Sequence, residues 1–169
     1  MFKHTIYKQY FISALCTAAL LTAFVLPAHA ADPGSIKITS FAEIEITVVD
    51  KEGKAQIQRT PVDTAVPGDE IIYTTTFENI INKPAGNIVI TNPIPNATTY
   101  RSASGANTEI TFSIDGGNKY AAPDKLIVTT SEGNTRPAMP SDYTHLRWAY
   151  KGELGAGKTS QVSFRTVIK

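Results

Sequence analysis

The chain is poor in the side chains on which most metal and nucleophilic sites depend. Its 169 residues include one cysteine, three histidines, two methionines and one tryptophan. The one cysteine, Cys16, lies in an N-terminal apolar segment of the kind that is removed on export. The mature chain would therefore form no disulfide, hold no metal through thiolates and have no thiol nucleophile. A chain of this length buries enough apolar surface to fold without such links.

An excess of charge of one sign is also lacking. The chain has 16 Lys and Arg residues against 15 Asp and Glu residues, and Lys3 and Lys8 belong to the N-terminal segment. The remainder is close to neutral and offers no electrostatic footprint for nucleic acid or for an anionic membrane. We therefore expect no nucleic-acid partner.

The N-terminus has the three-part layout of a secretory signal peptide. Lys3 and Lys8 form a short basic region, residues 10–26 form an apolar run, and Ala28 and Ala30 form an A-x-A site. This layout predicts cleavage after Ala30. The alternative is a retained membrane anchor, but the apolar run is barely long enough to span a bilayer.

Cleavage would leave residues 31–169 as a single domain that is secreted, periplasmic or on the cell surface. We expect no stable membrane span after the signal peptide is removed.

The mature chain is dominated by alternation of apolar and polar residues, with no convincing helical period. Ile36, Ile38, Ile44 and Ile46 recur at even positions over residues 36–48, which predicts one long half-buried strand or two strands joined by a bend. A turn at 50–53 would lead into a second strand. The strands expected from similar patterns are 36–48, 55–59, 70–80, 87–91, 98–102, 109–114, 126–130, 143–150 and 160–168.

Many short strands separated by Gly, Pro, Asn and Asp turns predict an all-β fold. We expect an immunoglobulin-like antiparallel β-sandwich of about 7–9 strands, with an antiparallel barrel as the alternative. A large core is expected from the aromatic residues on the strand faces.

Residues 152–159, GELGAGKT, match the phosphate-binding pattern G-x-x-x-x-G-K-[ST]. That pattern works only where a helix follows, because the helix N-terminus and the loop N–H groups converge on the phosphates. Only ten residues follow Thr159, and they alternate as a strand does. We interpret the segment as a glycine-rich hairpin between the Trp148 and Phe164 strands, with Lys158 in solvent, and expect no nucleotide and no other cofactor.

Residues 113–120, SIDGGNKY, resemble the Asp-box of sialidase-type propellers, with Lys119 and Tyr120 in place of Thr and Trp. A propeller needs several four-stranded blades and does not fit in this chain. We interpret the segment as a turn in which Asp115 caps backbone N–H groups. The spacing of Asp115 and Asn118 follows no established calcium loop, so no metal site is expected.

No catalytic constellation is recognisable. His145 is the only histidine of the mature chain and alternates with Leu146 and Trp148, so it should face outward beside Arg147. Nothing marks a nucleophile or an acid to accompany it. We therefore expect the protein not to be an enzyme.

Tyr100, Tyr120 and Tyr143 lie near predicted loops and are the candidate ligand-facing residues. Together they would form a platform on which a sugar ring stacks. A carbohydrate-binding module is the alternative function that they suggest.

Two segments resemble the DUF11 family of secreted and cell-surface domains of bacteria and archaea. Residues 66–79, VPGDEIIYTTTFEN, are similar to its PGD turn and Y-T strand, and residues 88–95, IVITNPIP, to its strand ending in D-P-L-P, with Asn92 in place of Asp. The final turn and strand also fit, so the resemblance spans about 62–169. It implies an Ig-like sandwich on an envelope protein, and it transfers no catalytic residue.

Together these patterns predict a non-catalytic secreted or cell-envelope module that recognises an envelope or extracellular protein through strand edges or loops. Residues 36–48 have two interpretations. They form the first strand of their own sandwich, or they pair with a neighbouring subunit by strand addition, which would be self-association.

Overall fold

The computed structural model describes residues 35–169. The predicted signal peptide, with Ala28 and Ala30 at its cleavage site, lies outside the described residues. The strands are β1 (Ile36–Val49), β2 (Ala55–Pro61), β3 (Glu70–Asn79), β4 (Ala85–Gly86), β5 (Val89–Pro93), β6 (Thr98–Gly105), β7 (Thr108–Ser113), β8 (Ile127–Thr129), β9 (Thr135–Pro137), β10 (His145–Tyr150), β11 (Glu153–Leu154) and β12 (Thr159–Ile168). Two short 3₁₀ helices, η1 (Pro123–Lys125) and η2 (Pro140–Asp142), complete the set of described elements.

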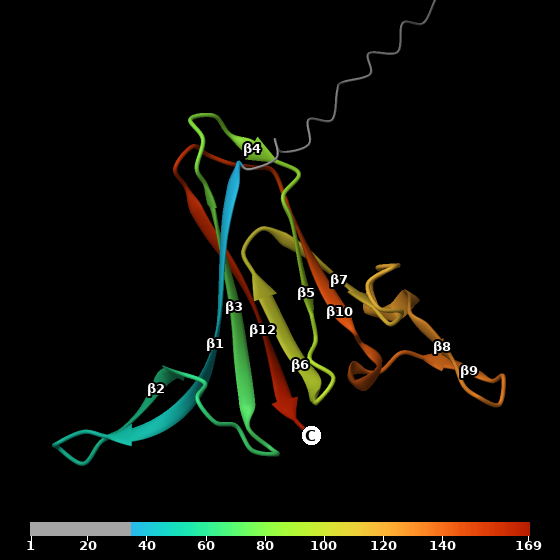
Figure 1. The fold of residues 1–169 in the computed structure, drawn as a ribbon, viewed down its shortest axis with the longest axis horizontal. Coiled ribbons are helices and arrows are strands. Elements are labelled where there is room, and N and C mark those ends of the chain that lie inside the picture. The colour runs from blue at the N-terminus through green and yellow to red at the C-terminus, as the bar shows by residue number, and fades with distance from the viewer. Residues whose placement is uncertain (1–34) are drawn as a thin grey trace, which may run out of the picture.

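The strands form two main antiparallel sheets that face each other (Figure 1). One sheet has the order β2-β1-β3-β12-β6 and the other has the order β5-β10-β7. Two small ribbons, β4 with β11 and β8 with β9, lie outside these sheets. The prediction of an all-β, immunoglobulin-like antiparallel sandwich is confirmed. The count of 7–9 strands was too low for the 12 described strands, because β4, β8, β9 and β11 are only two or three residues long.

The core lies between the two sheets. Leu146 and Trp148 of β10 are fully buried and face Phe77, Val162 and Phe164 of the larger sheet. Burying each such side chain stabilises the fold by roughly 1.5–3 kcal/mol. Strand alternation placed these residues correctly, because successive side chains of a strand point to opposite faces.

Strand β3 departs from simple alternation. Alternation puts Ile71, Tyr73, Thr75 and Phe77 on one face, and all of these are buried except Tyr73, which is half-buried. Ile72 and Thr74, on the opposite face, are also buried. In the strand registers Ile72 lies between Glu43 of β1 and Arg165 of β12. The central position of β3 in its sheet, with long side chains on both neighbours, therefore buries both of its faces.

Candidate interaction surface: the arm and the open edge of the sandwich

Strand β1 belongs to the sandwich along its first part only. It pairs with β3 over residues 36–44 and with β2 over residues 43–49. Because β3 begins at Glu70, opposite the end of this pairing, the rest of β1 continues beyond the sheet with β2 as its only partner. We call residues 45–59 the arm, and it projects from one end of the molecule (Figure 1).

Local hydrogen bonds form the tip of the arm. Asp50 Oδ1 accepts the N–H groups of Glu52 at 3.1 Å and of Lys54 at 2.8 Å. Gly53 has a positive φ of 82°, a conformation that favours glycine, and it closes the turn by donating its N–H to Asp50 O. The predicted hairpin at 50–53 is therefore present, with Asp50 as the residue that orders it.

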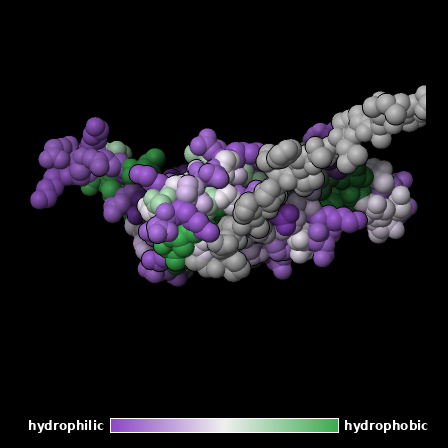
Figure 2. Space-filling view, turned by 90° about the horizontal axis from the view of Figure 1, so that it is seen from above, coloured by the Kyte–Doolittle hydropathy of each residue, from purple (hydrophilic) through white to green (hydrophobic). Residues whose placement is uncertain are grey.

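The arm exposes aliphatic side chains on both faces. Val49 and Ile57 share one face and are 67% and 74% exposed, and Ile46, on the other face, is 39% exposed. The space-filling view shows the arm projecting at the left, with a hydrophilic tip and hydrophobic residues behind it (Figure 2). The described chain therefore leaves apolar surface uncovered on both faces of this two-stranded ribbon.

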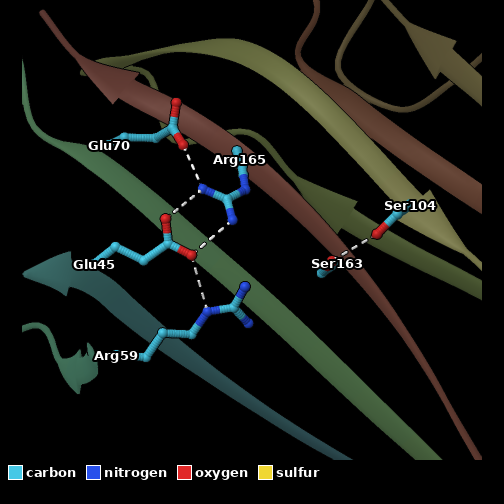
Figure 3. A network of polar contacts seen from close by, with 6 residues as sticks. All are labelled: Glu45, Arg59, Glu70, Ser104, Ser163 and Arg165. Carbon is cyan, nitrogen blue, oxygen red and sulfur yellow. Dashed lines mark hydrogen bonds and ion pairs between the residues drawn. The ribbon is translucent and has the colours of Figure 1, made fainter. Parts of the chain in front are cut away.

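An ion-pair network ties the root of the arm to the sandwich (Figure 3). Arg165 of β12 donates to both oxygens of Glu45, at 2.9 and 3.1 Å, and to Glu70 Oε1 at 2.6 Å. Arg59 of β2 donates to Glu45 Oε1 at 3.1 Å. The hydrogen bonds from Arg165 lower the pKa of Glu45 most, and the hydrogen bond from Arg59 lowers it further. Burial raises this pKa but offsets the two arginines only in part. The network therefore joins the two strands of the arm to β3 and β12 at the point where the arm leaves the sheet.

A groove of about 360 Å³ opens beside β1, between the two sheets. Its floor includes the stacked rings of Tyr73 and Phe164, whose centroids are 4.7 Å apart. The described residues that line it are Ser40, Phe41, Ala42, Tyr73, Thr75, Asn92, Pro93, Pro95 and Phe164, and all are uncharged.

A polar bridge connects the two sheets within this groove. Thr75 Oγ1 lies 3.0 Å from Ser40 Oγ, and it accepts a hydrogen bond of 3.0 Å from Asn92 Nδ2. Asn92 is the residue that replaces the Asp of the DUF11 pattern, and its amide donates where an ionised carboxylate could only accept. The bridge holds β1, β3 and β5 in a defined relation at the open side of the sandwich.

The outer edge of β1 carries unpaired backbone groups beside the groove. Ser35 O accepts the N–H of Ile80 at 3.0 Å, whereas Ala42 O accepts the N–H of Val62 at 3.3 Å on the other side of the strand. In an antiparallel strand the N–H and C=O of one residue point to the same side, and the side alternates along the chain. The backbone N–H and C=O groups of odd-numbered residues therefore point toward β3. The backbone groups of even-numbered residues point outward, and before Ala42 no strand of the described chain pairs with them. These unpaired groups belong to Ile36, Ile38 and Ser40.

The three predicted ligand-facing tyrosines lie in two different places in the structure. Tyr100 and Tyr143 contact each other at 5.7 Å between ring centroids, and both pack on Phe112 in the core, at 5.0 and 4.5 Å. Burial raises the pKa of both phenols. Tyr120 instead covers the guanidinium of Arg147 at 3.6 Å, on the outward face of β10. The three rings do not form one platform, because Phe112 and Arg147 lie on opposite faces of the smaller sheet.

The turn at 113–120 has the predicted form. Asp115 Oδ1 accepts hydrogen bonds from the N–H groups of Asn118 and Lys119 and from the hydroxyl of Ser113, at 2.7–3.1 Å. The bonds from the Lys119 N–H and from Ser113 lower the pKa of Asp115. Asp115 therefore acts as a cap for the turn.

GELGAGKT includes the short strand β11 and a turn before β12, and the hairpin interpretation was wrong. Thr159 begins β12, a strand, where the phosphate-binding pattern requires a helix. The strands on either side, β10 and β12, belong to different sheets, so the segment crosses from one layer of the sandwich to the other. Gly152 and Gly157 adopt positive φ, at 86° and 66°.

Asn79 at the end of β3 holds this crossing segment in place. Its side chain is fully buried and donates to Leu154 O at 2.7 Å and to Lys83 O at 2.8 Å. Its backbone exchanges hydrogen bonds with Gly157 and Lys158, at 3.0 and 2.9 Å. The glycine-rich segment thus packs on a structural asparagine.

His145 lies on the outward-facing side of β10, as expected from the alternation. It is half-buried, with Nδ1 3.2 Å from the hydroxyl of Thr144, and its ring packs beside Gly117. Within residues 35–169 no group of three or more His, Cys, Asp or Glu side chains is placed to hold a metal ion. The same residues include no helix with the length and apolar character needed to cross a membrane.

Sequence reasoning did not identify the network at the root of the arm. Glu45 and Arg165 are separated by 120 residues, and only the pairing of β1 and β12 with β3 brings them together. No family model, no curated protein and no solved structure matches the chain. The resemblance to DUF11 therefore stays a prediction from the residues quoted for it.

Proposed function

We propose that this protein is a non-catalytic interaction module of the cell envelope or of the exterior, exported by its signal peptide and related to the DUF11 domains. It recognises a protein partner through the arm and the neighbouring strand edge. The observation that carries this proposal is the arm itself, whose aliphatic residues project into solvent on both faces of a two-stranded ribbon.

The energetics of the arm support a role in binding. A two-stranded hairpin is marginally stable by itself, and exposed Val and Ile side chains contribute little to the stability of the chain that carries them. Covering Val49 and Ile57 with a partner would remove from water apolar surface that the fold leaves exposed. The fully buried centre of a protein interface is more apolar than its rim, and these two side chains suit that position.

The charged residues near the arm support binding over catalysis. Glu45, Glu70 and Arg165 are matched in ion pairs at the root of the arm, and the residues lining the adjacent groove are uncharged. Ion pairs of this kind hold the arm at a defined angle to the sandwich, and preorganisation lowers the entropic cost of binding.

Site-specific photocrosslinking in the producing cells tests this function. A photoreactive amino acid at Ile57 should give discrete, ultraviolet-dependent adducts with a neighbouring protein. Ile127 of β8 is the matched control, because it is also an exposed isoleucine on a short ribbon, at 52% against 74% for Ile57. The proposal would be wrong if position 57 gave no adduct, or if both positions gave the same pattern.

A further inference from the structure

The outer edge of β1 at residues 36–41 has little of the protection that exposed strand edges usually have. Its pairing with β3 runs over nine residue pairs with no register shift, so the edge is regular. Lys37 is its only charged residue. Native sheets usually protect an edge by proline, by a bulge or by charges. Three of the other edges have such features, since β2 ends at Pro61, β5 ends at Pro93, and a register shift interrupts the pairing of β6 with β12. The fourth edge, β7, is partly covered, because Phe112 exchanges backbone hydrogen bonds with Ala121.

We propose that a second copy of this chain pairs at this edge, antiparallel, with residues 36–40 of one copy against residues 36–40 of the other. This inference rests on the proposed function and names one partner for it. The two larger sheets would then form one continuous sheet across both copies, related by a two-fold axis. The arm stays free in this arrangement, because β2 lies beside β1 only from residue 43 onward.

The directions of the backbone groups determine the register. Only Ile36, Ile38 and Ser40 point their N–H and C=O groups outward, so these residues must face one another in hydrogen-bonded pairs. Ala42 ends the available edge, because its carbonyl already accepts from Val62. The register that uses all three residues places Ile38 opposite Ile38 of the second copy, and Ile36 opposite Ser40.

Side chains are compatible with this register. Ile38 is 56% exposed, and in the pair it would be covered by the same residue of the second copy. Lys37 lies on the other face and would stand opposite Thr39, so the two like charges are not directly opposed. The geometry is self-complementary over its whole length, and the identical edge of a second copy is therefore the occupant that fits it.

Engineered cysteines test the pairing directly. In a Cys16→Ser background each new cysteine is the only thiol, even in unprocessed chains. Directly opposed residues of a hydrogen-bonded pair lie about 5.5 Å apart at Cα, within the range for a disulfide, whereas diagonal neighbours lie about 7–8 Å apart. Protein recovered from its producing cells and mildly oxidised should form disulfide-linked dimers with Ile38→Cys, and at least about tenfold fewer with Lys37→Cys.

Ile127→Cys, on the exposed ribbon of β8 and β9, controls for random collision between copies. The inference fails if Ile38→Cys dimerises no more than Lys37→Cys or Ile127→Cys. It also fails if the unmodified protein stays a monomer in sedimentation at all concentrations up to the millimolar range.

A proline variant tests the same edge without a thiol. The N–H of Ile38 points away from β3, so Ile38→Pro removes a donor to the second copy and none within the chain. It should weaken dimerisation by about tenfold or more, because two equivalent hydrogen bonds are lost, with little change in the urea midpoint of the monomer. Unchanged dimerisation in a folded Ile38→Pro variant would overturn the inference. If Ile57 crosslinks to a neighbour while Ile38→Cys forms no dimer, the second-copy inference falls and the proposed function stands.

Discussion

Removing the side chain of Asn79 should destabilise the fold more than any surface substitution. The Asn79 amide donates to Leu154 O and to Lys83 O, and both it and Leu154 are buried. Losing a hydrogen bond costs about 1 kcal/mol, and leaving a buried carbonyl without a donor costs about 1–3 kcal/mol. The Leu154 carbonyl has no access to water, whereas the Lys83 carbonyl lies in an exposed residue. We therefore expect Asn79→Ala to lower the free energy of unfolding by about 2–4 kcal/mol.

Asn79→Asp isolates the role of the donor. It keeps the volume of the side chain and the oxygen that accepts the Ile81 N–H, but an ionised carboxylate donates nothing to the two carbonyls. At neutral pH it should cost at least as much as the alanine variant, because it also buries a charge. Asn82→Ala, an exposed asparagine three residues on, is the control and should change the free energy by no more than about 0.5 kcal/mol.

The assay is urea unfolding followed by tryptophan fluorescence. Trp148 is the only tryptophan and is fully buried in the core, so its emission reports directly on the packing of the two sheets. The reasoning is refuted if Asn79→Ala costs less than about 1 kcal/mol, or if Asn79→Asp is as stable as the native protein.

Two further predictions concern the ion pairs. Arg165→Ala should raise the pKa of Glu45 toward its ordinary value, measured by NMR titration. It should also speed proteolytic cleavage in the arm, because the arm would open locally more often. Arg101→Ala, an exposed arginine on β6, should do neither. A hydrogen bond from Arg136 lowers the pKa of Asp142 to about 2, below the ordinary value of about 4. The ionised Asp142 therefore contributes to the free energy of unfolding above about pH 4, and this contribution is lost as the pH falls toward 2. Asp142→Asn should reduce the loss of stability in this range by roughly 1–2 kcal/mol. The urea midpoint of the variant should then depend less steeply on pH. An equally steep dependence in Asp142→Asn would contradict this assignment.

Features that depend on neighbouring residues were predictable from the sequence. The turn at 113–120 is an example, because the hydrogen bonds of Asp115 reach only residues within four positions of it. The alternation at 143–150 correctly identified Leu146 and Trp148 as core residues, since the period of two decides which face a side chain occupies. The strand at 36–48 was also recognisable, although its division into a sandwich part and an arm was not.

Features that depend on which strands become neighbours were not predictable. GELGAGKT looked like a hairpin because its two flanking strands follow each other in the chain, yet these strands belong to different sheets. Tyr100 and Tyr143 lie near predicted loops and were expected to face a ligand, but both pack on Phe112. No local pattern marks either outcome.

The sequence by itself determined the class of fold, the positions of most strands and turns, and the side of each strand that faces the core. These properties follow from hydrophobic period and from turn residues, which act over a few positions. The order of the strands in the sheets determined the arm, the ion-pair network at its root and the open edge. Because β3 ends its pairing opposite Ile44, β1 continues as an arm, Glu45 meets Arg165, and residues 36–41 are left as an open edge. Such contacts join residues far apart in the chain, and only the tertiary structure brings them together.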